Sequence, residues 1–435
     1  MAGGDHGGVR RRDAGRPAVG LAHQRRRREP PLCPGAAGAR ADRRIPAEPA
    51  AVTRLDPTPF AADAALSVVW DALPEARVAG GAVRDSLAGR PVSDIDLATP
   101  RPPQDVTAAL SRAGVRVVPT GVTHGTVTAV VQGRGFEITT LRHDVETDGR
   151  HAVVAFTDDW QADASRRDFT INAMSMTRDG TVYDYFGGVA DLAAGRVRFV
   201  GDAVARIHED YLRILRYFRF YGRYASQPPD ADTVAALVEG IPGLARLSVE
   251  RVWAELRLIL GADDPAASVA LMVRLGIWQA VLPEATPVER LAGLPADPIL
   301  RLAAMLSGDP LALALRLKLS NHDRDRLVRL AATPSVRAED DDATLRRLLA
   351  DHRTEDLIDR VWLDGGPAAL RQRLAAMPRP VFPLVGRHVR ALGVSQGPRV
   401  GELLRDVRQW WLDGGCVADA TACRAELARR ACAAG

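Results

Sequence analysis

The 435-residue chain is predicted to have an α+β fold, in which an N-terminal part holds a mixed β-sheet with helices and a C-terminal part is all α-helical. Strand-like apolar runs stop near Val200, and from about Asp202 onward apolar residues recur at helical spacing between Gly and Pro breaks. Ahead of both parts, residues 1–50 are rich in Gly, Pro and Arg and show no apolar period. We therefore expect residues 1–55 to form a disordered extension.

This N-terminal segment also dominates the net charge. Residues 1–50 carry 11 Arg and 5 acidic residues, a net charge of +6, so the remainder of a chain whose total is +4 has a net charge of −2. A surface for nucleic acid in the folded part is then expected to be a local patch. Two interpretations of the segment stay open: an extension caused by an upstream start codon, and a basic arm that binds nucleic acid.

No segment is typical of export or of membrane insertion. Residues 1–50 lack the apolar core of a signal peptide, and no run reaches the roughly 18 apolar residues that a membrane span requires. The gaps of six and eight residues between Cys416, Cys423 and Cys432 do not match zinc-ligand spacing. We expect reduced thiols and a cytoplasmic protein, and nothing in the sequence indicates an oligomeric state.

The first motif that carries chemistry is VAGGAVRD, over residues 78–85. Residues 77–79 predict a short strand, Gly80 and Gly81 interrupt it, and the following residues predict one or two helical turns. Glycines at a strand-to-helix junction let backbone N–H groups approach triphosphate oxygens, and the helix N-terminus adds positive potential. Arg84 is expected to add a bidentate contact to phosphate.

A pair of carboxylates follows nine residues after this motif. Asp94-Ile-Asp96-Leu97 alternates polar and apolar residues, which predicts a strand with both carboxylates on one face and Ile95 and Leu97 toward the core. Two hard oxygen ligands at i and i+2 can hold Mg²⁺ ions that bridge nucleotide phosphates and activate an attacking hydroxyl. Such pairs are common in solvated turns, but at this distance behind the glycines we predict that Asp94 and Asp96 are metal ligands and catalytic residues.

A third carboxylate is expected on a neighbouring strand. Residues 124–131 and 136–142 are rich in β-forming residues and are separated by Gln-Gly-Arg-Gly, which predicts a hairpin. Glu137 lies on the face opposite to Phe136 and Ile138, so it can point the same way as the aspartates. We predict that Glu137 is the third catalytic carboxylate, with a surface glutamate as the alternative.

Three further motifs follow in order: RRDFTINA over residues 166–173, EDYLRILRYFRF over 209–220 and ERVWAEL over 250–256. Together with the two motifs above, they resemble the class II tRNA nucleotidyltransferases (CCA-adding enzymes) and their bacterial poly(A) polymerase relatives. The resemblance is strong over about residues 60–260 and looser toward the C-terminus. It implies a nucleotidyltransferase palm over residues 56–200, a neck of base- and RNA-binding helices over 201–262, and a tRNA-binding helical body and tail over 263–435.

The resemblance also implies how the nucleotide is held. Arg167 would fix the nucleotide and Asp168 would accept from a ribose 2′-hydroxyl, which would favour NTP over dNTP; a sheet-edge salt bridge is the alternative for this pair. Residues 169–173 alternate as an ordinary strand would. Arg216 and Arg219 lie at three-residue steps along the next motif and could reach the triphosphate, although a solvated basic helix face would also explain them.

Asp210 and Arg213 are one turn apart and are predicted to share a helix face. In the family, the matching pair acts as an amino-acid template for the incoming base. A carboxylate accepts from the exocyclic amine of C or A, and a guanidinium donates to the ring nitrogen beside it; U and G present the opposite pattern. Glu250, Arg251 and Glu255 are expected to support this template helix.

CCA addition is the activity that the resemblance implies: CMP, CMP and AMP are transferred from CTP and ATP to the 3′ end of a tRNA primer, with Mg²⁺ as cofactor and pyrophosphate as leaving group. Within the family, the alternatives are poly(A) polymerase and enzymes that add only CC or only A. Full CCA addition is thought to require a flexible loop after the third carboxylate, and the polar segment 142–152 could serve.

Two alternatives come from other classes of protein. A catalytically inactive RNA-binding module is disfavoured because Asp94, Asp96 and Arg84 are intact. A small-molecule nucleotidyltransferase is disfavoured by the long helical C-terminal half.

Overall fold

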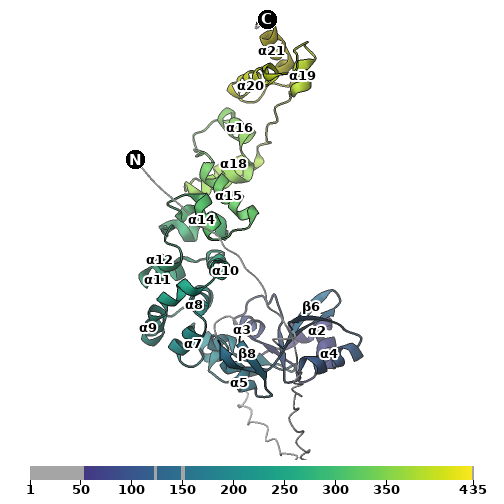
Figure 1. Cartoon of the computed structure of the whole chain (residues 1–435), viewed down its shortest axis with the longest axis vertical. Helices are drawn as coiled ribbons and strands as arrows, with labels where there is room; N and C mark the ends of the chain where they lie inside the picture. Colours follow the sequence, from purple (N-terminus) through teal and green to yellow (C-terminus); the bar gives the residue numbers. More distant parts are fainter. Residues whose placement is uncertain (1–52, 122–124, 148–151, 434–435) are drawn as a thin grey trace, which may run out of the picture. The chain divides into compact units, whose positions relative to one another are not determined.

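The computed structural model describes residues 53–121, 125–147 and 152–433 (Figure 1). Within these residues, the N-terminal part forms a mixed eight-stranded sheet with the strand order β1-β10-β9-β2-β3-β6-β5-β4, and a separate two-stranded sheet is formed by β7 and β8. The strands are β1 Thr53–Arg54, β2 Arg77–Ala79, β3 Leu97–Thr99, β4 Arg116–Gly121, β5 Thr126–Val131, β6 Arg134–Thr140, β7 Arg142–Thr147, β8 Ala152–Phe156, β9 Met174–Met176 and β10 Thr181–Asp184. The predicted α+β fold is confirmed.

The centre of the sheet sets the geometry of the carboxylates. Strands β3 and β6 pair in parallel, with Leu97 opposite Ile138, whereas the neighbouring pairs β2–β3 and β5–β6 are antiparallel. The predicted hairpin is confirmed: Val131 pairs with Arg134, and Gln132 and Gly133 between them both adopt positive φ, as a tight two-residue turn requires. The turn therefore fixes the register of β6, and with it the face on which Glu137 lies.

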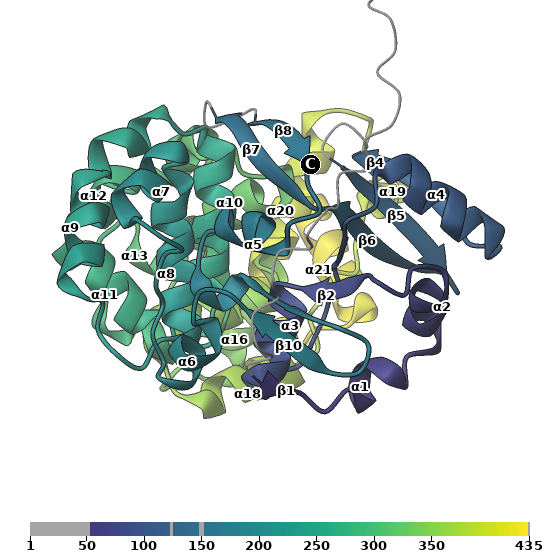
Figure 2. The same ribbon diagram turned by 90° about the horizontal axis from the view of Figure 1, so that it is seen from below.

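Helices in the N-terminal part cover the sheet and supply its core. The N-cap residue of helix α2 is Asp63, whose carboxylate accepts from the backbone N–H groups of Ala65 and Leu66. Its buried residues Leu66, Val69 and Trp70 recur at helical spacing, and α2 and α4 both pack on β5 (Figure 2). The helices of this part are α1 Thr58–Ala61, α2 Ala64–Ala72, α3 Gly81–Leu87, α4 Pro103–Arg112, α5 Trp160–Ser165, the 3₁₀ helix η2 Thr170–Asn172 and α6 Gly188–Ala193.

Among the described residues after 200, every regular element is a helix, as predicted. These elements are α7 Ala203–Glu209, α8 Leu212–Tyr224, α9 Ala231–Glu239, η3 Ile241–Arg246, α10 Val249–Leu260, α11 Ala266–Arg274, α12 Ile277–Val281, η4 Glu289–Gly293, α13 Pro298–Met305, α14 Pro310–Arg316, α15 Asn321–Ala332, α16 Asp342–Asp351, α17 Thr354–Leu363, α18 Ala368–Ala376, α19 Gly386–Arg390, α20 Pro398–Asp413 and α21 Ala420–Ala433. The largest apolar cluster of the helical part includes buried residues of helices α7 to α15. Two further apolar clusters are separate from it, one within residues 336–374 and one within 384–427.

The boundaries of the predicted parts differ from the structure at two places. Residues 1–52 lie outside the described residues, but β1 at Thr53–Arg54 pairs with β10, so the sheet begins inside the predicted extension 1–55. The core also crosses the predicted palm boundary at residue 200, because Phe169 and Phe199 pack in the same apolar cluster as Tyr217 of α8. The last turns of the N-terminal part and the first helices of the C-terminal part thus share one core.

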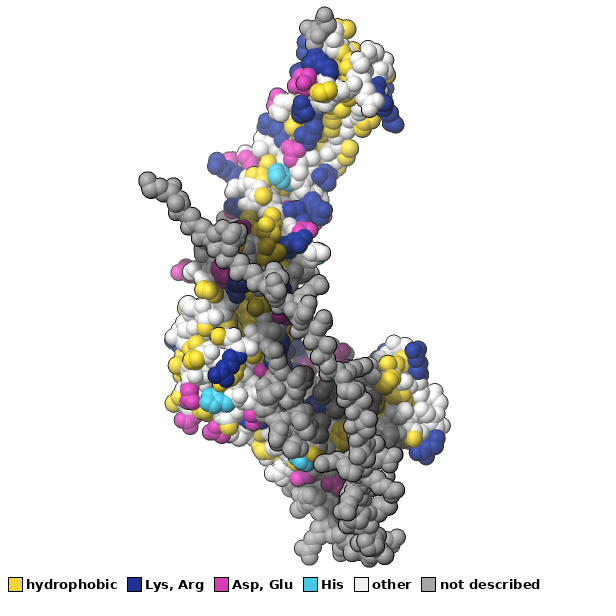
Figure 3. Space-filling view, viewed as in Figure 1, with side chains coloured by type: hydrophobic (Ala, Val, Ile, Leu, Met, Phe, Trp, Pro, Cys, Tyr) yellow, Lys and Arg dark blue, Asp and Glu magenta, His cyan; other side chains and the backbone are white. Residues whose placement is uncertain are grey.

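The charged side chains and the cysteines of the described residues are as the sequence leads us to expect. On the face seen in Figure 3, basic and acidic side chains are interspersed over the C-terminal helices. Cys416, Cys423 and Cys432 are free thiols, as expected, whereas Cys33 lies outside the described residues. A helix of the length and apolarity that would cross a membrane is not found in the described part of the chain.

Candidate active site

The glycine pair lies at a strand-to-helix junction, as the sequence predicts. Strand β2 ends at Ala79 and helix α3 begins at Gly81, with Gly80 between them at φ +66°. A Cβ atom at Gly80 would lie 2.9 Å from Nη1 of Arg167, so a side chain there would be both strained and in collision with that guanidinium. The positive φ is the main reason that glycine is favoured at residue 80, since the flexible end of Arg167 could shift.

Arg84, which is predicted to contact phosphate, is hydrogen-bonded within the chain. Its Nε and Nη2 atoms lie 3.1 and 3.0 Å from the two carboxylate oxygens of Asp85, and Nη1 donates to Oδ1 of Asn172 at 2.5 Å. Arg84 is 8% exposed, and the rings of Phe220 and Tyr224 lie 5.1 and 4.6 Å from its guanidinium carbon. A buried guanidinium needs a counter-charge, and the adjacent carboxylate supplies it. Arg84 still borders the cavity described below.

The carboxylate pair lies in a loop, not in the predicted strand. Strand β3 begins only at Leu97, so Asp94 and Asp96 belong to the segment that leads into it. The register of the sheet relates Asp96 to Glu137: Leu97 pairs in parallel with Ile138, and Asp96 and Glu137 each lie one residue before these partners. Glu137 is exposed while its neighbours Phe136 and Ile138 are buried, as predicted.

These three carboxylates influence one another electrostatically. Partial burial, together with the negative charges of Glu137 and Asp94, raises the pKa of Asp96 above its ordinary value, while Arg167 opposes the shift. Among the described residues, no side chain donates a hydrogen bond to Asp96, and Asp94 accepts one from Ser93 at 3.1 Å. Oxygen donors that repel one another and keep free lone pairs fit a divalent cation, which would relieve the repulsion. No cluster of three or more such ligands is gathered in the described part of the chain.

The Arg167–Asp168 pair is held by several neighbours. Nη2 of Arg167 lies 3.2 Å from the Asp163 carboxylate, and Nη1 lies 3.5 Å from the carbonyl oxygen of Asn172. On Asp168, Oδ1 accepts from Nδ2 of Asn172 at 3.0 Å and from the backbone N–H of Phe169 at 2.9 Å. Arg216 donates twice to Oδ2, once through Nε at 2.7 Å and once through Nη2.

Asp168 therefore accepts four hydrogen bonds within the chain and is 8% exposed. Burial opposes ionisation, but the charge of Arg216 and the hydrogen bonds hold the pKa of Asp168 below its ordinary value. A carboxylate has about four lone-pair positions. A direct bond to a ribose hydroxyl would thus have to displace one of the four donors.

The predicted strand over residues 169–173 is wrong. Thr170–Asn172 form the 3₁₀ helix η2, and the strand starts only at Met174. Thr170 donates to the buried carboxylate of Asp191 at 2.7 Å, and its carbonyl carbon would lie 2.8 Å from a Cβ at Gly188, so helix α6 packs directly on this turn. These contacts turn the chain and bring Asn172 beside Asp168.

The prediction that Asp210 and Arg213 share a face of one helix is wrong, because only Arg213 lies in a helix. Helix α7 ends at Glu209, and Asp210 is extended, with φ −154° and ψ 107°. Its carboxylate accepts from the backbone N–H of Leu212 at 3.1 Å, so it caps the start of α8, and from Arg251 at 2.7 Å. Arg213, in the first turn of α8, donates to the Glu209 carboxylate at 2.5 Å.

Glu255 of helix α10 supports helix α8, as expected. It lies 2.9 Å from Arg219 and 3.8 Å from Arg216, and it is 6% exposed. Arg251 does more than support the helix, since it borders the cavity and pairs with Asp210. Glu250 instead forms an exposed pair with Lys318 at 2.5 Å.

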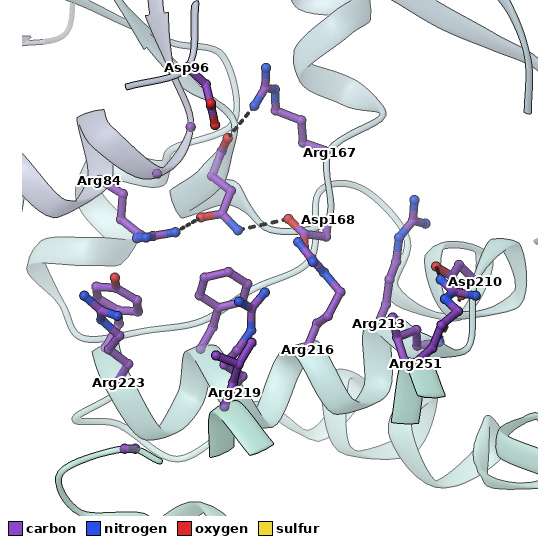
Figure 4. A pocket seen from close by; sticks show the side chains of 18 of the residues that line it. Arg84, Asp96, Arg167, Asp168, Asp210, Arg213, Arg216, Arg219, Arg223 and Arg251 are labelled. Carbon is purple, nitrogen blue, oxygen red and sulfur yellow. Dashed lines mark hydrogen bonds and ion pairs between the residues drawn. The ribbon is translucent and has the colours of Figure 1, made fainter. Parts of the chain in front are cut away.

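A cavity of about 750 Å³ collects most of these residues (Figure 4). Figure 4 shows Arg213, Arg216, Arg219 and Arg223 rising in a row from α8, with Asp96 and Arg167 on the opposite wall and Asp210 beside Arg251 at one end. Of the predicted site residues, the lining includes Gly80, Gly81, Arg84, Asp96, Arg167, Asp168, Asp210, Arg213, Arg216 and Arg219. Asp94 and Glu137 are not part of it.

The lining carries eight arginines and three aspartates, an excess of positive charge that suits a triphosphate. Sequence reasoning did not assign Asn172, Phe220, Arg223 and Tyr224, which also line the cavity. A signal existed for three of them. Arg223 lies one helical turn beyond Arg219, and Asn172 and Phe220 lie inside motifs that were already singled out.

The fold and the cavity define a nucleotidyltransferase with a poly(A) polymerase type of head domain. The family model described as the poly(A) polymerase head domain matches residues 76–198, and that of a probable RNA and SrmB-binding site of polymerase A matches residues 229–288. The mitochondrial CCA tRNA nucleotidyltransferase 1 of Mus musculus is 41% identical over 362 residues, which cover 78% of this chain and 83% of the mouse protein. The chain therefore belongs to the CCA tRNA nucleotidyltransferase family of enzymes.

Bacterial relatives agree with this assignment. The CCA-adding enzyme of Geobacillus stearothermophilus is 38% identical over 207 residues, covering 47% of this chain and 50% of that protein. The crystal structure of the Bacillus stearothermophilus CCA-adding enzyme in complex with CTP superposes with a TM-score of 0.71 at 26% identity, and the match covers 85% of this chain and 97% of that one.

Proposed function

We propose that this chain adds CMP, CMP and AMP in turn to the 3′ end of tRNA, with CTP and ATP as substrates and pyrophosphate as leaving group. One observation carries the proposal: a single cavity holds Asp96 on one wall, a row of arginines on the other and the Asp210–Arg251 pair at its end. This arrangement provides separate places for the reacting phosphate, the triphosphate charge and the edge of a base.

Mg²⁺ is the proposed cofactor, and Asp94 and Asp96 are the residues that would hold it, with Glu137 as the adjacent third carboxylate. When bound, the ion supplies charge neutralisation at the phosphates and lowers the pKa of the attacking 3′-hydroxyl. Mg²⁺ usually combines one or two protein carboxylates with substrate phosphates, so a site with few protein ligands suits it. The chain's own contribution is to fix these carboxylates through the parallel pairing of β3 with β6.

The arginines of the cavity would hold the triphosphate. Arg167 lies beside Asp96 and keeps donors that are not used by Asp163, so it is placed to contact the phosphates nearest the carboxylates. Arg219 and Arg223 are partly exposed, at 26% and 50% of their side chains, and they can turn toward an anion. Arg84 borders the same cavity, and its bidentate contact to phosphate is part of the proposal.

Base selection is assigned to Asp210 and Arg213. Each oxygen of Asp210 accepts one hydrogen bond within the chain, so each retains a lone pair for the exocyclic amine of C or A. Arg213 has further N–H groups that can donate to the ring nitrogen beside that amine. U and G would leave these groups unpaired, at a cost of about 1–3 kcal/mol for each group.

The test uses tRNA transcripts that end at the discriminator base, after one C, or after two C, each incubated with single labelled NTPs and Mg²⁺. Successive addition of C, C and A, followed by a stop, is the expected result. Long A tails would identify a poly(A) polymerase, and extension of only one kind of primer would identify a partial enzyme. Labelling of small acceptors without tRNA, or no incorporation at all, would contradict the proposal.

The cellular compartment of this chain is the subject of a separate proposal. The cytoplasm is expected from the sequence, whereas the murine relative is named as mitochondrial. Fractionation of the source cells, followed by immunodetection of the chain, decides between the two.

A further inference from the structure

The Asp85 carboxylate receives hydrogen bonds from two helices. From its own helix α3, Nε and Nη2 of Arg84 lie 3.1 and 3.0 Å from Oδ1 and Oδ2. From the last turn of α8, the hydroxyl of Tyr224 donates to Oδ1, and Nη2 of Arg223 lies 3.9 Å from Oδ2. Arg84 and Tyr224 line the cavity, whereas Asp85 does not belong to its lining. The carboxylate thus connects two residues of the cavity without bordering it.

Tyr224 is held in place by contacts that do not use its hydroxyl. Its ring stacks on that of Phe220, with the centroids 6.1 Å apart. Nη2 of Arg90 donates to the backbone carbonyl of Arg223 at 2.9 Å, which ties down the end of α8. Burial and the hydrogen bond to Asp85 raise the pKa of Tyr224, so the hydroxyl keeps its proton at neutral pH and remains a donor.

The Asp85 carboxylate in turn orients Arg84. A pairing of two guanidinium nitrogens with two carboxylate oxygens is bidentate and brings the two groups toward one plane. Nη1 of Arg84 also donates to Asn172 at 2.5 Å. Within the described part of the chain, three of the five N–H groups of Arg84 are therefore used, and two remain for a phosphate. The direction of these two groups follows the plane of the carboxylate.

The plane of the Asp85 carboxylate needs a restraint from outside α3. Rotation about the last bond of an aspartate is only weakly restrained by the side chain itself. Arg84 is its neighbour in sequence, so the two groups can turn together. The hydroxyl of Tyr224 reaches Oδ1 from a different helix and fixes the carboxylate relative to α8, which also carries Arg216 and Arg219.

We propose that Tyr224 is a positioning residue for the triphosphate: its hydroxyl fixes the Asp85 carboxylate, which directs the two remaining N–H groups of Arg84 toward the phosphates. The inference rests on the proposed function, in which Arg84 makes a bidentate contact to phosphate. Tyr224 acts through Asp85 and Arg84, and the base is read at the other end of the cavity. The same effect is therefore expected for CTP and for ATP.

The first experiment compares kcat and KM on a tRNA primer for the wild type and Tyr224→Phe, which removes the hydroxyl and keeps the ring. The KM for CTP and for ATP should each rise about tenfold with kcat unchanged, because a hydrogen bond to a charged group that aligns Arg84 is lost. The KM for tRNA and the preference for CTP over UTP should stay the same. The matched control is Tyr221→Phe on the same helix, outside the lining of the cavity, which should behave as the wild type.

Two inhibitors that compete with CTP separate positioning from a general loosening of the cavity. With Mg²⁺ in excess, the inhibition constant of inorganic tripolyphosphate should rise in Tyr224→Phe about as much as the KM for CTP, while that of cytidine stays unchanged. Equal rises for both inhibitors would overturn the inference. A wild-type KM for CTP and ATP in Tyr224→Phe would overturn it as well.

A double variant tests whether Tyr224 acts through Arg84. Arg84→Lys removes the bidentate fork and keeps the charge. In that background, Tyr224→Phe should raise the KM for CTP no further, whereas a full additional rise would overturn the inference. If the wild type transfers no nucleotide to tRNA, the proposed function fails instead. Calorimetric binding of CTP and tripolyphosphate without tRNA then still measures the effect of Tyr224→Phe, so the two failures are distinguishable.

Discussion

Nη2 of Arg251 lies 2.7 Å from Oδ2 of Asp210, and this ion pair joins helix α10 to the short non-helical link between α7 and α8. Asp210 is extended and belongs to no helix. Its carboxylate is held by this ion pair and by the hydrogen bond that it accepts from the backbone N–H of Leu212. The proposed base-reading carboxylate is therefore positioned by a residue 41 positions away in sequence.

Arg251→Ala should lower kcat/KM for both CTP and ATP by about tenfold, because a charge-assisted hydrogen bond that fixes Asp210 is lost. The matched control is Arg257→Ala, an exposed arginine on the same helix, which should leave both values unchanged. Steady-state kinetics on a primer that ends at the discriminator base measures the effect. Equal values for Arg251→Ala and the control would show that Asp210 needs no partner on α10.

Asp210→Ala should relax discrimination against UTP and GTP, because the penalty for a mismatched donor pattern disappears with the carboxylate. Arg213→Ala should lower incorporation of both C and A, since a charged donor to the ring nitrogen is lost. Measuring kcat/KM for all four NTPs distinguishes these patterns. Proportional losses for the four nucleotides in both variants would mean that the two residues only support the helix.

Asp94→Ala and Asp96→Ala should each abolish incorporation while the melting temperature and tRNA binding are retained, since both side chains lie at the surface of a loop. Asp105→Ala, at the exposed start of α4, is the control for removing a carboxylate from the same part of the chain. Substantial incorporation at saturating Mg²⁺ in either variant would contradict the metal assignment.

The pH dependence of stability should change in Asp168→Asn. Because the pKa of Asp168 is lowered in the folded state, the group contributes stability above its ordinary value of 3.8, and that contribution is lost as the pH falls through the lowered value. The melting temperature of the variant should thus lie below that of the wild type near neutral pH, and the gap should narrow in acid. A gap that stays constant down to about pH 2 would show that the ion pair with Arg216 adds no net stability.

Deletion of residues 1–50 should leave CCA addition and the melting temperature within error of the full chain, because the segment shows no apolar period and the deletion keeps β1, the first described strand of the sheet. Deletion of residues 1–55 should lower the melting temperature, since it removes β1 and its pairing with β10. Thermal melts and the KM for tRNA are compared for the three chains. A large rise in KM after the shorter deletion, abolished by high salt, would instead indicate a basic arm that binds phosphates.

Local pattern was enough to predict the parts of the site that depend on neighbours in sequence. The Gly80–Gly81 junction, the Gln132–Gly133 turn and the face of Glu137 all follow from short-range rules for turns and strand alternation. The helical character of everything after residue 200 follows from apolar periodicity in the same way.

Partners that come from distant segments were beyond the reach of such rules. At the break between α7 and α8, Asp210 bonds to the backbone of Leu212 and to Arg251 of α10. The guanidinium of Arg84 donates to Asn172, which is 88 residues away in sequence. The 3₁₀ turn at Thr170–Asn172 replaces the predicted strand because α6 packs against it. In each case a tertiary contact outweighs a local preference.

The apolar cluster that unites Phe169 and Phe199 with Tyr217 has a consequence for how the enzyme loses its structure. A fragment that ended at residue 200 would expose the aromatic rings that α8 buries, so the sheet and the first helices are expected to melt together as one cooperative unit. The carboxylates Asp94 and Asp96 lie in the loop before β3, and the proposed base-reading residues Asp210 and Arg213 lie at the start of α8, on the other side of that unit. Loss of the packing around these three rings should therefore unfold both sides of the site together.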